Sequence, residues 1–375
     1  MRIILCKISS HPTIVFAVEE LARCLKAMDE KAVIDQRVYD VYDPSLAGVV
    51  WVGMDGTVEE SVDDAICIEV KNGSGHITGS SPRAVLIAAY RFLTELGCRW
   101  LRPGKDGEIL PHCTLTNEML CVSVNAKASY RHRAVCIEGS VSYEHVYNMI
   151  DYLPKVGMNG YYAQFFVPYT FFERWYKHEF NPLREAEPLE TEDVVHMWRS
   201  LEEEIVKRDL LYHATGHGWT CEPFGLHANG WHANASVIPP ETTRYFAEVN
   251  GKRELWEKVA LNTNLCYSDP IVRDTVTGAI TAYCKAHPSI DYLHFWLADG
   301  TNNHCECENC RKMRPSDFYV LMLNELDRKM TEVGIQTKIV FLLYYELLWA
   351  PETMRIENPD RFVLMFAPIT RSYNN

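Results

Sequence analysis

Apolar residues in the first 125 positions fall into short runs and amphipathic segments. Pro12–Lys26 carries an apolar residue at every third or fourth position, which is the spacing of one helix face. Ser81-Pro82 introduces a second helix, Arg83–Leu96, with Gly97 as its expected end. The short runs predict strands at Met1–Cys6, Gly48–Gly53, Ala65–Val70 and His76–Gly79, the last two joined by a tight turn at Asn72-Gly73. We therefore expect a small α+β domain over residues 1–125.

From residue 126 onward, apolar runs alternate with amphipathic segments at longer spacing. The runs predict strands at Arg133–Glu138, Gly160–Phe166, Leu210–Thr215, Tyr292–Ala298, Lys338–Tyr345 and Phe362–Ala367. The segments predict helices at Ser142–Lys155, Thr191–Lys207, Asp269–Ala286 and Ser316–Val333. This alternation predicts an α/β fold with a parallel sheet, and a (β/α)8 TIM-type barrel is its expected form over residues 126–375. With six strands, the expectation is a barrel truncated after about the sixth strand, the alternative being an open sheet.

A long stretch with little periodicity, Glu222–Asn264, follows the third predicted strand. It is rich in His, Asn, Gly and Trp. Long loops at the carboxyl ends of barrel strands commonly serve as lids or binding loops. We therefore expect this insertion to lie at the functional edge of the sheet.

Composition narrows the classes of protein that fit. The 375 residues are 47% hydrophobic and 23% charged, as in ordinary globular proteins. A net charge of -13 argues against a nucleic-acid partner. The amino terminus is a poor secretory signal, and no apolar stretch approaches the roughly 20 residues of a membrane span. Thirteen cysteines, an odd number scattered through apolar segments, favour reduced thiols and a cytoplasmic location.

Three carboxylates stand at the carboxyl ends of predicted strands: Glu138, Asp299 and Glu346. Parallel α/β folds place catalytic groups at this edge. Asp299 opens the polar turn Asp-Gly-Thr-Asn-Asn after an apolar run rich in aromatic residues. Each carboxylate also has a structural interpretation, with Asp299 and Glu138 as capping or turn residues and Glu346 as a surface charge.

Two passages resemble a known family. Ile77–Gly104, ITGSSPRAVLIAAYRFLTELGCRWLRPG, resembles the amino-terminal domain of bacterial hexosaminidases and α-glucuronidases. Leu265–Cys310, which contains an aspartate followed by Cys-x-Cys-x-x-Cys, resembles the domain of unknown function 4838, a family related to glycoside hydrolase families 20 and 163. The resemblance implies a bacterial glycoside hydrolase with a hexosaminidase-like barrel. Its substrate would be an oligosaccharide or glycan that contains N-acetylhexosamine or uronic acid.

The resemblance also implies roles for individual residues. Thr215-Gly216-His217 stands where hexosaminidases carry Pro-Gly-His, so His217 would border the site. Arg133 falls near the position of a substrate-binding arginine. The acidic pair of those enzymes falls on Ala298-Asp299, and Ala298 departs from the pattern because it cannot orient an acetamido group. Substrate-assisted catalysis is therefore not carried over.

The expected chemistry is acid–base cleavage of a glycosidic bond. Asp299 would be the general acid, with its pKa raised by burial against Trp296, and Glu346 or Glu138 would be the second carboxylate. Side chains nearby are expected to bind or position the sugar: His217, Trp219 as a stacking platform, Tyr344, Gln164, Asn302 and Asn303. Each of these also has a structural interpretation as an ordinary core or loop residue.

Cys305, Cys307 and Cys310 have a spacing close to that of a metal-binding knuckle. Structural zinc needs four ligands, so a distant Cys221, Cys266 or histidine would have to complete the site. The alternative is three reduced thiols in a loop. Glycoside cleavage itself requires no cofactor.

Two further functions stay open at this point. One is a non-catalytic carbohydrate-binding protein on a degenerate hydrolase barrel, which Ala298 and the small number of strands favour. The other is a zinc-dependent hydrolase that uses His217 and the cysteines. The expected partner is an oligosaccharide or glycan substrate, with no membrane and no nucleic acid, and the oligomeric state is not predicted.

Overall fold

The computed structural model describes residues 1–38, 42–227, 230–233 and 238–374. Contacts between residues divide the chain into two compact units. Unit 1 comprises Met1–Val135, Val141–Tyr161 and His196–Leu211, and unit 2 comprises Cys136–Ser140, Tyr162–Val195 and Tyr212–Asn375. The domain boundary expected between residues 125 and 126 stays a prediction.

Unit 1 contains a mixed sheet of six strands in the order β2-β1-β3-β5-β4-β8. The strands are β1 (Arg2–Lys7), β2 (Val33–Val38), β3 (Val49–Val52), β4 (Ala65–Lys71), β5 (Ser74–Gly79) and β8 (Val122–Lys127), beside a small hairpin of β6 (Arg99–Trp100) and β7 (Glu108–Ile109). The four strands expected from apolar runs are present. Strands β2 and β8 have no counterpart among the predicted strands. The edge strand β2, of sequence VIDQRV, is partly exposed along its length and has no apolar run.

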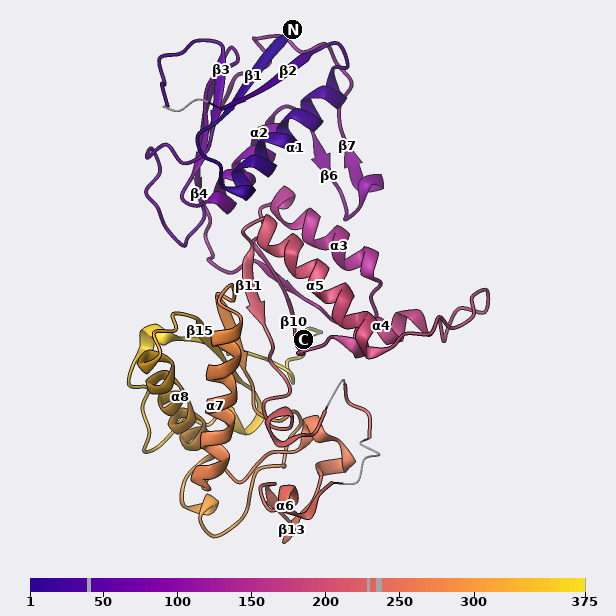
Figure 1. The fold of residues 1–375 in the computed structure, drawn as a ribbon, viewed down its shortest axis with the longest axis vertical. Coiled ribbons are helices and arrows are strands. Elements are labelled where there is room, and N and C mark those ends of the chain that lie inside the picture. Colours follow the sequence, from indigo (N-terminus) through magenta and orange to yellow (C-terminus); the bar gives the residue numbers. More distant parts are fainter. Residues whose placement is uncertain (39–41, 228–229, 234–237, 375) are drawn as a thin grey trace. The chain divides into compact units, whose positions relative to one another are not determined.

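Two helices, α1 (Pro12–Met28) and α2 (Pro82–Glu95), lie side by side in unit 1 (Figure 1). The Ser81 hydroxyl accepts a hydrogen bond from the Ala84 N–H and so begins α2 where the sequence predicts. The apolar faces of both helices join the strands in one buried core. Local patterning and capping agree in this unit, which explains why its helices were predictable.

The second large sheet has six strands that follow the chain order, β9-β10-β11-β14-β15-β16. They are β9 (Ala134–Cys136), β10 (Gly160–Ala163), β11 (Leu211–Ala214), β14 (Tyr292–Phe295), β15 (Lys338–Leu343) and β16 (Phe362–Phe366). The pairs β11–β14, β14–β15 and β15–β16 are parallel. This sheet is a curled, parallel half-barrel of the TIM type, and its six strands are those that the sequence predicts.

Helices follow the strands as expected: α3 (Tyr143–Tyr152), α5 (Thr191–Lys207), α7 (Pro270–Ala286) and α8 (Pro315–Glu332), with a short α4 (Tyr169–Tyr176). In unit 2, α7 and α8 pack against each other (Figure 1). Among the described residues, no helix is long and apolar enough to cross a membrane. The carboxyl ends of β14 and β15 lead into the loops that carry the candidate chemistry.

The insertion after β11 contains more regular structure than its sequence predicts. It includes a short helix, α6 (Pro240–Thr243), and a hairpin of β12 (Glu248–Val249) and β13 (Lys252–Arg253). Several 3-10 turns complete the connections in the chain: Lys105–Gly107, Leu153–Val156, Glu222–Phe224, Trp256–Lys258, Ala260–Asn262, Cys310–Lys312, Tyr345–Leu348 and Pro359–Arg361. The hairpin lies against the loop after β14, because the Glu306 N–H donates to the Glu248 carbonyl at 2.7 Å.

Candidate functional site

Asp299 stands at the centre of the candidate site, in the turn after β14. Its Oδ2 accepts a hydrogen bond from Trp231 Nε1 at 2.8 Å. Its Oδ1 accepts from the Tyr344 hydroxyl at 2.7 Å and from the Gly300 N–H at 2.8 Å. The carboxylate is therefore held by an indole from the insertion and a phenol from the end of β15.

These contacts keep Asp299 ionised. Burial raises the pKa of Asp299. Hydrogen bonds from Tyr344, Gly300 and Trp231, together with the charge of His217 when protonated, lower it by more, so the pKa lies below its usual value. The expectation that burial makes Asp299 a protonated acid near neutrality is wrong. Two of the aromatic residues around Asp299, Trp231 and Tyr344, also donate hydrogen bonds to its carboxylate. The sequence does not show that these two side chains reach Asp299.

The turn that carries Asp299 is braced from within. Gly300 and Asn302 adopt φ values of 90° and 57°, which glycine and asparagine tolerate best. Asn303 is only 1% exposed, and its amide donates to the carbonyls of Asp299 at 2.6 Å and Asn262 at 2.7 Å. Asn303 therefore supports the loop and does not face solvent, whereas Asn302 is exposed at its rim.

His217 follows β11 and packs among aromatic rings. Its ring centroid lies 5.3 Å from Phe165, 5.6 Å from Trp231 and 4.9 Å from Trp296. Burial lowers its pKa to about 4, although the nearby charges of Asp299 and Glu138 oppose this shift. His217 is thus neutral at physiological pH and can accept or donate one hydrogen bond.

Glycine before His217 is a geometric requirement. A Cβ on Gly216 would come within 2.4 Å of the Trp296 ring. The N–H groups of Gly216 and His217 both donate to the Gln164 carbonyl, at 2.9 and 2.7 Å. This turn allows the Trp296 indole to lie directly on the backbone and fixes the direction of the His217 ring.

Glu138 is exposed and follows β9. Gln164 Nε2 donates to Glu138 Oε2 at 2.7 Å and to the Ile137 carbonyl at 3.0 Å, so Gln164 orients this carboxylate. The charge of Glu138 acts on His217 together with that of Asp299. The structure therefore brings Glu138, His217 and Asp299 together around one part of the sheet edge.

Glu346 lies in the turn after β15 and has different partners. Its Oε1 accepts from the Thr301 hydroxyl and from the Asn302 N–H, each at 2.7 Å. Burial raises its pKa, but these donors hold the pKa below its usual value. Its carboxylate lines a cavity of about 330 Å³ together with His304 and Asn302. Glu346 braces the Asp299 turn from the side of the cysteines.

Two predicted site residues are placed elsewhere. Arg133 belongs to unit 1 and precedes β9, where its guanidinium bonds to Asp64 at 2.5 Å and to the Gly157 carbonyl at 2.7 Å. Trp219 is 1% exposed, and its Nε1 donates to the His294 carbonyl at 2.9 Å. Trp219 is thus a core residue with no face open to a sugar. The indole that contacts Asp299 is that of Trp231, which the sequence indicated only through the richness of its loop in Trp and His.

The three predicted cysteines do form a cluster, and a fourth thiol completes it. The sulfur atoms of Cys266, Cys305, Cys307 and Cys310 all lie within 4.8 Å of one another. Cys266 supplies the fourth thiol, while Cys221 is buried elsewhere and bonds to the Gly218 carbonyl. Among the described residues this group could hold a metal ion, and it does not include His217.

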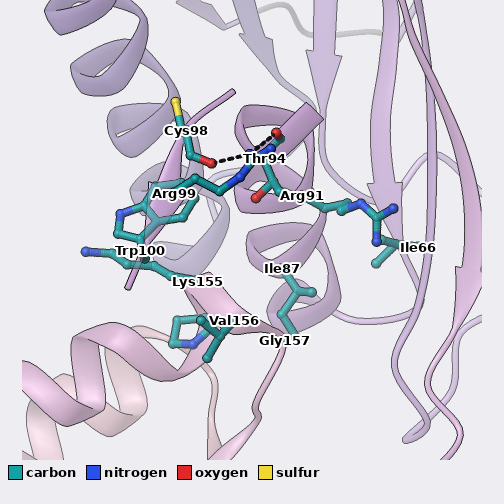
Figure 2. Close-up of a pocket in the computed structure, with 11 residues that line it drawn as sticks. Ile66, Ile87, Arg91, Thr94, Cys98, Arg99, Trp100, Lys155, Val156 and Gly157 are labelled. Atoms are coloured by element: carbon teal, nitrogen blue, oxygen red, sulfur yellow. Dashed lines mark hydrogen bonds between the residues drawn. The ribbon is translucent and has the colours of Figure 1, made fainter. Parts of the chain in front are cut away.

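A separate cavity of about 340 Å³ lies in unit 1 (Figure 2). Figure 2 shows the Arg99 side chain turned toward the Thr94 and Cys98 carbonyls, to which it donates at 2.6 and 2.7 Å. Arg91 pairs with Glu95, and Lys155 with Asp151. None of the described residues that line it is a carboxylate, so this cavity lacks the groups for glycoside chemistry.

Comparisons with known proteins place the fold. No family model and no curated protein sequence matches the chain. A family GH138 enzyme targeting pectin rhamnogalacturonan II matches with a TM-score of 0.50 and 11% identity, over 91% of this chain and 35% of that enzyme. The chitobiase of Flavobacterium johnsoniae matches with a TM-score of 0.50 and 12% identity, over 92% and 50% of the two chains. A family 89 glycoside hydrolase from Clostridium perfringens matches with a TM-score of 0.51 and 9% identity, over 95% and 40%.

These matches show a glycoside hydrolase-like fold. At 9 to 12% identity they carry no information about substrate or mechanism. The chain spans between about a third and a half of the length of these structures. The resemblance to the domain of unknown function 4838 stays a prediction.

Proposed function

We propose that this chain carries the carboxylate site of a glycoside hydrolase at the carboxyl edge of the half-barrel. The observation that carries the proposal is the arrangement around Asp299. An ionised carboxylate is held by Tyr344 and Trp231, beside a neutral His217 and near an exposed second carboxylate, Glu138. Two carboxylates with different environments are what cleavage of a glycosidic bond requires.

The environments of the two carboxylates suggest their roles. Asp299 is ionised, so it would act in one of two ways. It would either attack the anomeric carbon as the nucleophile or remove a proton from the water that attacks this carbon. Glu138 is exposed and is oriented by Gln164, so it is the candidate for the general acid that faces the leaving oxygen of a bound sugar. Glu138 would then donate its proton to the leaving oxygen as the glycosidic bond breaks. Glu346 is the alternative second carboxylate, although its Oε1 is already bonded within the loop.

The proposed substrate is a glycan. Trp231, Tyr344 and His217 offer ring faces and polar tips around Asp299, a combination suited to sugars. The sequence resemblance implies N-acetylhexosamine or uronic acid glycans, so aryl glycosides of both sugar types belong in a substrate screen. The cleavage needs no cofactor. The odd number of cysteines, scattered through apolar segments, supports the proposed cytoplasmic location.

The test is hydrolysis of a panel of aryl glycosides by the wild type and four variants. We expect Asp299→Asn and Glu138→Gln each to lower kcat/KM by about a hundred-fold or more. Glu346→Gln should lower it less and mainly through stability. Glu332→Gln, an exposed carboxylate at the end of α8, is the control and should leave the rate unchanged. An unchanged rate in Asp299→Asn would overturn the proposal.

A second function, carbohydrate binding without catalysis, is favoured by one observation. Three donors already occupy the Asp299 carboxylate, which leaves it fewer lone pairs for a reacting group. Calorimetric titration with the same sugars distinguishes the two functions. Binding that is lost in Trp231→Ala, with no hydrolysis of any aryl glycoside, would favour the binding protein.

A further inference from the structure

Four cysteine thiols from two distant segments meet in unit 2. Cys266 lies two positions after the end of the insertion, and Cys305, Cys307 and Cys310 come from the loop that begins with Asp299. Forty-one residues separate Cys266 from Cys307 along the chain. The four sulfur atoms nevertheless lie within 4.8 Å of one another, so the fold brings the two segments together at the cysteines.

Distances between the sulfur atoms match those of a tetrahedral metal site. Cys266 Sγ lies 3.7 Å from Cys307 Sγ and 3.8 Å from Cys310 Sγ. Four sulfurs about 2.3 Å from a central Zn²⁺ form a tetrahedron with edges of about 3.8 Å. A disulfide would require sulfur atoms at about 2.05 Å. These two spacings therefore suit thiolates around a single ion and exclude a disulfide within either pair.

The surroundings supply the donors that such a site needs. The Glu248 N–H donates to Cys305 Sγ at 3.3 Å, and Cys310 Sγ lies 3.1 Å from the Ser268 hydroxyl. The Arg253 guanidinium, from the β12–β13 hairpin, lies near enough for its charge to interact with the thiols of Cys266 and Cys305. Four thiolates around Zn²⁺ carry a net charge of -2, which this cation and these dipoles partly balance.

We propose that Cys266, Cys305, Cys307 and Cys310 bind one structural Zn²⁺ ion. Four protein thiolates close the tetrahedral shell, whereas catalytic zinc keeps one position open for water. This separates the site from a zinc-dependent hydrolase. An iron–sulfur cluster would place several atoms between the thiolates and hold them further apart.

The ion would fasten the insertion to the loop of Asp299. A hydrogen bond already joins the insertion to the loop after β14, because the Asn264 amide donates to Asn303 Oδ1 at 2.9 Å. The Asp299 N–H itself donates to the Leu261 carbonyl at 2.9 Å. A metal cross-link at Cys266 thus shortens the free length of the insertion and stabilises the turn that positions Asp299.

Metal content of the purified full chain tests this proposal without reference to activity. We expect about one zinc per chain by plasma mass spectrometry in protein purified without added metal or a metal-binding tag. Cys266→Ser and Cys307→Ser should each lose most of the zinc. Cys121→Ser, an exposed thiol in unit 1, is the matched control and should keep it.

A titration of the wild type covers the case in which the cysteine variants do not fold. Stepwise addition of a mercurial that modifies thiols should release one zinc as four thiols react, measured with a chromogenic chelator. Cobalt exchanged into the site should give the intense absorption of tetrahedral cobalt thiolate. Wild-type protein without zinc after reduction and zinc addition, stoichiometric iron in its place, or zinc retained in Cys266→Ser would overturn the proposal.

Discussion

At the residue scale, the chemistry of the candidate site depends on what surrounds each carboxylate. Asp299 and Glu138 both follow a parallel strand, but Asp299 is partly buried under three donors and Glu138 is exposed with Gln164 as its partner. The same side-chain type therefore enters the site in two different states. The proposed division of roles between the two carboxylates would rest on this difference in environment.

Tyr344→Phe tests the state of Asp299. The variant removes the hydroxyl that donates to Asp299 Oδ1, so the pKa of Asp299 should rise toward its ordinary value. Loss of a hydrogen bond to a charged group should cost about 1.5–3 kcal/mol of stability. The acidic limb of the kcat/KM profile should move to higher pH, because a carboxylate with a higher pKa is already protonated at a higher pH. Tyr345→Phe, the neighbouring phenol, is the control, and a profile unmoved in Tyr344→Phe would contradict the assignment.

Asp317 gives a pH prediction for stability. Burial raises its pKa, but the backbone N–H groups of Met354, Thr353 and Glu352 lower it to about 2. A lowered pKa stabilises the folded state above the unfolded pKa, near 3.9, and that contribution is lost as the pH falls toward 2. Asp317→Asn should lower the free energy of unfolding by about 1–3 kcal/mol at neutral pH. In urea titrations, this difference from wild type should shrink between pH 4 and pH 2; a constant difference would refute the prediction.

At the element scale, strand ends and tight turns decide where side chains point. The turn after β11 brings Gly216 against the Trp296 ring, and the turn after β14 uses glycine and asparagine at positive φ. The strands place these turns at the same edge of the sheet. Small residues in the turns then allow aromatic rings to pack directly on the backbone.

Gly216→Ala should disturb this packing. A methyl group would lie 2.4 Å from the Trp296 ring, so the indole or the strand end must shift, at a cost of about 1–3 kcal/mol. The shift should also move His217 and lower kcat/KM. Gly278→Ala in α7 is a matched control, since its methyl group would meet only Lys329 Nζ at 3.9 Å and should stabilise the helix by about 0.5–1 kcal/mol. Thermal unfolding of both variants gives the measurement, and equal effects would contradict the packing argument.

At the scale of the whole molecule, a buried ion-pair network joins distant segments of unit 1. Asp64 accepts from Arg83 at 2.9 Å, from Arg133 at 2.5 Å and from Asn159 at 2.8 Å. Asp64, Arg133 and Asn159 each precede a strand, and Arg83 lies in the first turn of α2. The network explains the place of Arg133 without a substrate.

Arg133→Ala separates the structural role of this arginine from substrate binding. Removing one partner leaves the buried Asp64 charge less compensated and should lower stability by about 3–5 kcal/mol. The KM of the folded fraction should stay near that of wild type. Arg131→Ala, which pairs with the partly exposed Asp63, should cost less than about 1 kcal/mol. A raised KM with unchanged stability in Arg133→Ala would return the residue to the substrate site.

The sequence by itself determined the alternation of strands and helices, the six parallel strands and the presence of carboxylates at their carboxyl ends. These features are local, because periodicity and turn residues act over a few positions. It also indicated a cysteine cluster, from three cysteines within six residues.

Only the tertiary structure decided which side chains meet. Trp231 reaches Asp299 from 68 positions away, and Cys266 joins Cys307 from 41 positions away. Trp219 turns into the core although it stands beside His217 in sequence. Such partners depend on contacts between segments that are distant in the sequence. Trp231 helps to keep Asp299 ionised, and Cys266 adds the fourth thiol to the cysteine cluster. Sequence spacing cannot predict these contacts, because the segments that meet are far apart along the chain.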